Sequence, residues 1–129
     1  MKKSVSIFLV LVLMVFSTIT AFAADPANIA VAAEGQAPSS QVSAVAARCP
    51  YFLLFDEKGT FVEAVANPHK DAPGGAGSQT VEFLAGKGVT VVIAGAFGPK
   101  MVGAMHAAGM RYLEFKGNAA DAVNQALKK

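Results

Sequence analysis

The sequence predicts an α/β domain of three layers (α/β/α), with helices on both faces of a mixed five-stranded sheet. Short apolar runs of strand length alternate with segments of helical period, which favours parallel strands joined by helical crossovers. One pair of strand-like runs is separated only by residues 56–59 (DEKG), which have turn chemistry. Because such a short turn joins antiparallel strands, the predicted sheet is mixed.

The first half of the predicted domain contributes three strands. Residues 29–33 (IAVAA) are apolar on both faces, as in an interior strand covered on each side. Residues 35–47 are rich in Ala, Ser, Gln and Pro and predict a loop or a poorly formed helix. Residues 51–55 and 60–66 contain aromatic and β-branched side chains and form the predicted hairpin.

The second half alternates helix and strand patterns. Apolar residues at helical spacing end at Gly88, Pro99 suits a first helical position, and Asn118 is a good N-cap. The run before Gly95 is apolar on both faces and is expected to be central. The predicted elements are a helix at 78–87, a strand at 89–94, a helix at 99–108, a strand at 110–115 and a helix from 118.

Residues 1–23 are predicted to be a secretory signal peptide, which leaves 24–129 as a single domain. Lys2 and Lys3 precede an apolar run at 7–16, and the small-x-small pattern at 21–23 suits signal peptidase. The run is too short for a spanning helix, although an uncleaved anchor stays an alternative. We therefore expect a periplasmic or secreted protein.

Charge and cysteine content narrow the partners. Removing Lys2 and Lys3 from the eleven basic residues leaves nine, against nine acidic residues, so the processed chain is formally neutral. This balance argues against nucleic acid and, after cleavage, against a membrane surface. The single cysteine, Cys49, cannot form an internal disulfide, which leaves burial, an intermolecular bridge or a ligand role.

The predicted strand directions bring several loops to one edge of the sheet. The turns at 67–79 and 95–98 would meet there, and two helix N-termini, which favour anions, would open onto them. The glycine run lacks the spacing and lysine of a Walker loop, so a simple tight turn is the alternative. The candidate anion-binding residues are Arg48, Gly74, Gly75, Gly77, Gly95 and Gly98.

The candidate metal ligands are Cys49, His69 and His106. A thiol or imidazole would suit copper, zinc or iron, and Met101 and Met105 on the helix of His106 would suit copper. A buried cysteine, a solvated loop histidine and core methionines are the alternatives. No nucleophile-base-acid set stands out, so binding or carriage is favoured over catalysis.

Several stretches together resemble the dinitrogenase iron-molybdenum cofactor binding family, which includes nitrogenase cofactor carriers and the orange protein with its molybdenum-copper-sulfur cluster. They are 29–32, 42–43, 48–52 (RCPYF), 67–68, 72–77 (APGGAG), 98–99 and 107–109. The resemblance implies a ribonuclease H-like domain and a non-catalytic role in binding or delivering an anionic metal-sulfur cluster (molybdenum with iron or copper). It adds Ser43 and Asn67 to the candidate cofactor-binding residues.

Two features depart from the family pattern. Val45 stands where the family often has a histidine, which excludes a ligand at that position, and export separates the chain from cytoplasmic nitrogenase assembly. The hypothesis is therefore an exported carrier of an anionic metal species, with an acceptor metalloprotein as a further partner. The alternatives are a metal-free small-anion or protein-interaction module and a ribonuclease H-like hydrolase, which would need clustered carboxylates.

Overall fold

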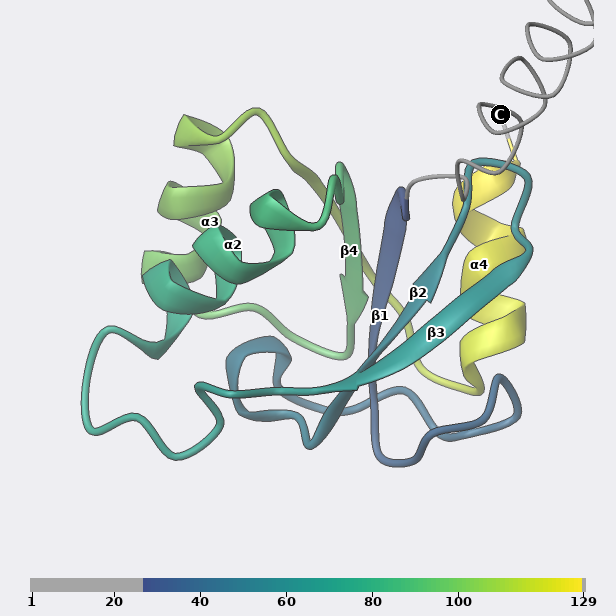
Figure 1. Cartoon of the computed structure of the whole chain (residues 1–129), viewed down its shortest axis with the longest axis horizontal. Helices are drawn as coiled ribbons and strands as arrows, with labels where there is room; N and C mark the ends of the chain where they lie inside the picture. The colour runs from purple at the N-terminus through teal and green to yellow at the C-terminus, as the bar shows by residue number, and fades with distance from the viewer. Residues whose placement is uncertain (1–26, 129) are drawn as a thin grey trace, which may run out of the picture.

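The computed structural model describes residues 27–128, so the predicted signal peptide at 1–23 lies outside the described residues. Five strands form one mixed sheet in the order β3-β2-β1-β4-β5 (Figure 1). The strands are β1 Ile29–Ala33, β2 Tyr51–Phe55, β3 Phe61–Ala66, β4 Val91–Ala94 and β5 Arg111–Glu114. The predicted α/β class and the mixed five-stranded sheet are confirmed.

The strand directions place most strand ends at one edge of the sheet. β1 is parallel to β4, which is parallel to β5, while β2 is antiparallel to both β1 and β3. In register, Ile29 lies opposite Phe55 on one side and Val91 on the other. The carboxyl ends of β1, β3, β4 and β5 therefore share an edge with the start of β2. Asp56 and Glu57 lie at the opposite edge.

Helices cover the two faces of the sheet. α2 (Ala76–Gly86) and α3 (Pro99–Ala107) lie on one face, and α4 (Ala119–Leu127) lies on the other (Figure 1). Alternate residues of each interior strand enter the two cores: Ala30 and Ala32 face α2 and α3, whereas Val31 and Ala33 face α4. This alternation explains why the interior strands are apolar throughout.

Element boundaries differ slightly from the sequence prediction. α2 begins at Ala76 rather than 78, because Gly75, with φ of 70°, reverses the chain just before it. β4 begins at Val91 rather than 89, and it lies inside the sheet while β1 takes the middle position. β3 begins one residue later than predicted, and α3 ends one residue earlier. β5 is one residue shorter than predicted at each end. The Asn118 N-cap is confirmed, because its Oδ1 accepts from the Asp121 N–H at 2.8 Å.

Residues 35–47 form a strap along the carboxyl edge of the sheet rather than a regular helix. Isolated bridges join Val42 to Ala33 and Gln41 to Asn118. The strap ends in a short 3-10 helix, η2 (Ala46–Arg48), which leads into β2. Within residues 27–128, the helices are too short to cross a membrane.

Candidate functional site

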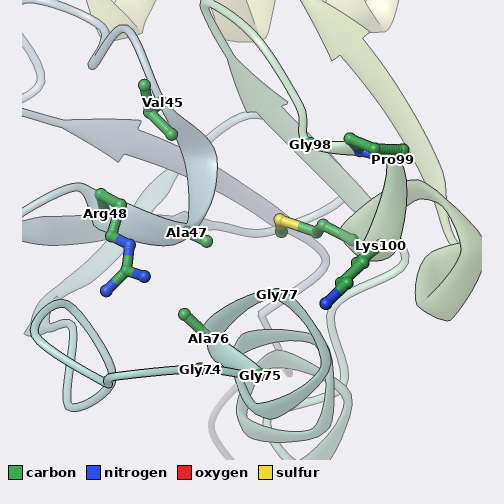
Figure 2. Close-up of a pocket in the computed structure, with 11 residues that line it drawn as sticks. Val45, Ala47, Arg48, Gly74, Gly75, Ala76, Gly77, Gly98, Pro99 and Lys100 are labelled. Atoms are coloured by element: carbon green, nitrogen blue, oxygen red, sulfur yellow. The ribbon is translucent and has the colours of Figure 1, made fainter.

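A cavity of about 400 Å³ lies at the carboxyl edge of the sheet, where three separate segments meet (Figure 2). One segment is η2, the second is the glycine-rich turn before α2, and the third is the turn that opens α3. The lining residues are Val45, Ala47, Arg48, Gly74, Gly75, Ala76, Gly77, Gly98, Pro99, Lys100 and Met101. The structure therefore brings together five of the candidate anion-binding residues, namely Arg48, Gly74, Gly75, Gly77 and Gly98.

Glycine exposes the backbone along two walls of this cavity. A Cβ added at Gly74, Gly75 or Gly98 would meet no atom within 4 Å, so the space beside these residues is open. Gly75 also has a left-handed φ of 70°, which L side chains adopt only with strain. The open backbone makes the wall accessible to the surface of a ligand.

Both helices that open onto the cavity present their amino ends to it. The first helical bonds run from Gln79 N–H to the Gly75 carbonyl and from Val102 N–H to the Gly98 carbonyl. Neither α2 nor α3 has a side-chain cap or an acidic residue in its first turn. Their first N–H groups and positive dipole ends therefore favour an anion.

Two basic side chains belong to the lining. Arg48 Nη1 donates to the Lys70 carbonyl at 2.9 Å and to the Ala72 carbonyl at 2.7 Å, which holds the guanidinium against the glycine-rich loop. Lys100 comes from the first turn of α3, and Figure 2 shows it across the cavity from Arg48. Sequence reasoning missed Lys100, although its place directly after Gly98-Pro99 was an available signal.

Asn67 connects η2 to the start of the glycine-rich loop rather than lining the cavity. Its Nδ2 donates to the carbonyls of Ala47 and Cys49, each at 3.0 Å, and its Oδ1 accepts from the His69 N–H at 3.0 Å. Asn67 is itself buried. Together with Arg48, it fixes the loop against the segment that carries Val45 and Ala47.

Ser43 in the strap and Gly95 directly after β4 lie outside the cavity lining. The Ser43 hydroxyl donates to Glu34 Oε2 at 2.9 Å, and its carbonyl accepts from the Gly95 N–H at 2.8 Å. A Cβ at Gly95 would come within 3.0 Å of Ala44 Cα. These two residues hold the strap against β4, and Gly95 lines a second hollow with Gln41, Val42, Ala44, Ala96, Phe115 and Lys116.

The three candidate metal ligands lie apart from the cavity lining. Cys49 is 0% exposed, and burial raises the pKa of its thiol from the ordinary 9.0 to about 12. His69 is half-buried, and its ring lies edge-on to the ring of Phe83 with 6.3 Å between the ring centroids. His106 is exposed on α3. Across residues 27–128, no three His, Cys, Asp or Glu side chains gather in a way that could hold a metal ion. The three residues therefore do not form a joint centre.

Val45 and Met101 contribute to the cavity wall, whereas Met105 lies in the core. Val45, at the position of the family histidine, lines the cavity and is 47% exposed. Met105 is fully buried in the core between α2, α3 and the sheet, and Met101 is buried there while contributing to the cavity wall. This core packing accounts for the helical spacing of the two methionines without copper.

The fold and its cavity define the class of the protein: an α/β domain with a ligand-sized hollow at the carboxyl edge of its sheet. Residues 27–129 match the family described as "Dinitrogenase iron-molybdenum cofactor". Because the match spans most of the chain, the protein belongs to this family. Membership of the family supports the binding of a metal cofactor.

Solved structures agree with this assignment. The apo form of the orange protein from Desulfovibrio gigas is 30% identical, with a TM-score of 0.73 over 81% of this chain and 90% of that one. A Thermotoga protein of the DUF35 family is 34% identical, and its description proposes it as a NifB protein. The TM-score is 0.65, and the match covers 78% of this chain and 85% of that one. No curated protein sequence matches the chain.

Proposed function

We propose that this protein is a non-catalytic carrier that binds an anionic metal-sulfur cluster or metal species outside the cytoplasm. The family assignment supports a metal cofactor as the ligand. The orange protein structure, described as an apo form, supports a fold that is stable without its ligand. Molybdenum, iron and copper are the candidate metals, and a ribonuclease H-like topology is part of the same proposal.

The observation that carries this proposal is the chemistry of the cavity lining. Two helix amino ends, open glycine backbone and two cations meet there, and the lining drawn from the described residues has no Asp or Glu. Such a surface stabilises negative charge through N–H donors and Coulomb attraction. It would hold the sulfur or oxygen shell of a metal anion from outside.

The lining also indicates how the ligand is held. Among the described lining residues, only Met101 has a sulfur atom, a soft ligand that suits copper, and Met101 is 2% exposed. A cluster that brings its own sulfide or oxide ligands needs no further bond from the protein. Delivery to an acceptor metalloprotein fits this mode, because release would then break only hydrogen bonds and electrostatic contacts.

The export part of the proposal is supported by the predicted signal peptide. A carrier outside the cytoplasm would receive metal species from the envelope or surroundings rather than from cytoplasmic nitrogenase assembly. A cargo other than the nitrogenase cofactor would also account for Val45 at the position of the family histidine.

The test is the metal content of the protein isolated from its native host without chelators or affinity tags. We expect molybdenum, iron or copper in the wild type, and a lower content in Arg48→Gln, which removes the charge, and in Gly74→Val, which fills the open wall. Gly103→Ala, on the exposed side of α3, is the matched control and should keep wild-type content. Wild-type protein without these metals, and without binding to added molybdate or tetrathiomolybdate, would refute the proposal.

The ligand roles of Cys49 and His69 stay predictions with a separate test. Cys49→Ser and His69→Ala are expected to lower metal content while the fold is retained. Wild-type content in the double variant would remove both residues from the site, and would leave the cavity as the binding element by itself.

A metal-free small-anion or protein-interaction module is the second candidate, and Val45 in the cavity is the observation that favours it. In that case molybdate, tetrathiomolybdate and copper would all leave the thermal unfolding temperature unchanged. A hydrolase would need clustered carboxylates at this edge, and the described lining offers none to support it.

A further inference from the structure

Arg48 and Lys100 approach the cavity from elements that are far apart in the sequence. Arg48 ends η2, whereas Lys100 lies in the first turn of α3. Figure 2 shows the two side chains on opposite sides of the cavity, with the stretch from Gly74 to Gly77 running between them. A ligand resting on the glycine wall would therefore have one cation on each side.

Within the described part of the chain, neither cation is paired with a carboxylate. Arg48 Nη1 bonds two backbone carbonyls, which position the guanidinium but carry no net charge. Among residues 27–128, the structure shows no ion pair made by Arg48 or by Lys100. The first turn of α3 contains no acidic residue that could screen Lys100 locally.

This local excess of positive charge occurs in a domain whose predicted processed form is neutral. Residues 24–129 contain nine basic and nine acidic side chains, and the cavity lining includes two of the basic ones and none of the acidic ones. Two facing cations repel each other when the cavity is empty, and one cation would be enough to attract a monoanion. A second, opposed cation is favourable when the ligand bears a second negative charge.

We infer that the cavity selects anions with at least two negative charges, and that Lys100 sets this preference as a charge partner opposite Arg48. The inference rests on the proposed function, because it specifies the charge of the same ligand. It adds a specificity residue outside the glycine and arginine positions. Tetrahedral thiometallate or oxometallate dianions and more highly charged clusters belong to the selected class.

The experiment compares tetrathiomolybdate, a dianion, with tetrathiorhenate, a monoanion that has the same tetrahedral sulfur shell. Dissociation constants of both are measured by calorimetry with purified wild-type protein and Lys100→Gln at low ionic strength. Because the Coulomb term doubles with ligand charge, Lys100→Gln should weaken the dianion about tenfold and the monoanion about threefold. The wild-type preference for the dianion should therefore shrink about threefold in the variant.

Two further variants separate charge from structure. Lys100→Arg keeps the charge and should restore the wild-type ratio. Lys58→Gln removes an equal charge from the hairpin turn at the opposite edge of the sheet and should leave the ratio unchanged. Circular dichroism of each variant establishes that it is folded.

The outcomes distinguish this inference from the function on which it rests. Binding of both anions with the same ratio in wild type and Lys100→Gln would overturn the charge selection and leave the carrier proposal standing. Binding of neither anion by the wild type would count against the carrier proposal, and the charge selection would be lost with it.

Discussion

At the residue scale, Asn67, Cys49 and Arg48 determine the shape of the cavity wall. Asn67 bonds the Ala47 and Cys49 carbonyls, and Arg48 bonds the Lys70 and Ala72 carbonyls, so each side chain ties η2 to the glycine-rich loop. Cys49 is enclosed beneath this connection. These side chains satisfy backbone groups that a loop would otherwise expose to solvent or leave unpaired.

The buried thiol of Cys49 should make stability depend on alkaline pH. Its pKa is about 12 in the folded protein, because burial disfavours the thiolate, against 9.0 for an ordinary thiol. Below pH 9.0 both states keep the proton and the stability is complete. Between pH 9.0 and about 12 the unfolded state loses the proton first, so the free energy of unfolding falls as the pH rises.

Urea denaturation at neutral pH and at about pH 10.5 checks this prediction. Wild-type protein should lose more stability over this interval than Cys49→Ala, which has no thiol to titrate but shares every lysine and tyrosine. An equal loss in the two proteins would show that the thiol ionises as readily in the folded state as in the unfolded one.

At the element scale, the packing of α2 on α3 depends on Gly77. A Cβ at this position would lie 3.0 Å from Met101 Cβ and 3.1 Å from both Met101 Cα and N. Two of these atoms belong to the α3 backbone and cannot rotate away. The absence of a side chain at Gly77 therefore lets the two helix amino ends lie close together, which creates one anion-binding cavity instead of two separate helix ends.

Gly77→Ala is expected to lower the free energy of unfolding by about 1–3 kcal/mol, because the added methyl overpacks the helix contact. It should also weaken anion binding by separating α2 from α3. Gly103→Ala is the matched control, because a Cβ there meets nothing within 4 Å. It should gain about 0.5–1 kcal/mol from the lower entropy of its unfolded chain. Thermal and urea unfolding of both variants test the pair, and equal stability of the two would contradict the close contact.

At the scale of the whole molecule, the mixed sheet creates the binding edge. Because β2 alone runs against the other four strands, its start meets the ends of β1, β3, β4 and β5. The connections after these strands and before β2 are therefore gathered at one edge (Figure 1). The hairpin turn is left at the far edge, which separates Asp56 and Glu57 from the cations of the cavity.

Export is a prediction for the whole molecule, and it concerns residues outside the described structure. Protein recovered from the cell envelope or medium should begin at Ala24, after cleavage of the 21–23 pattern. Intact mass spectrometry of fractionated cells measures this directly. Recovery of the chain from the cytoplasm with residues 1–23 still attached would contradict it.

Much of the fold could be predicted because its signals are local in the sequence. The apolar run of β1, the turn chemistry at 56–59 and the Asn118 cap each act over a few neighbouring residues, and each produced the expected element. The strand directions followed from these elements, because a short turn and a helical crossover permit different geometries. The meeting of Arg48 with the glycine turns followed in turn from those directions.

Tertiary structure alone decided which residues at this edge of the sheet line the cavity. Lys100 enters the cavity, Asn67 turns away to bond η2, and Cys49 is enclosed in the core. These outcomes depend on contacts between residues distant in the chain and on a packing of α2 against α3 so close that a Cβ at Gly77 would lie about 3 Å from Met101. The sequence by itself determined the layers and the edge, because periodicity and turns act locally. The site was decided by packing, because burial and charge proximity exist only once the segments have met.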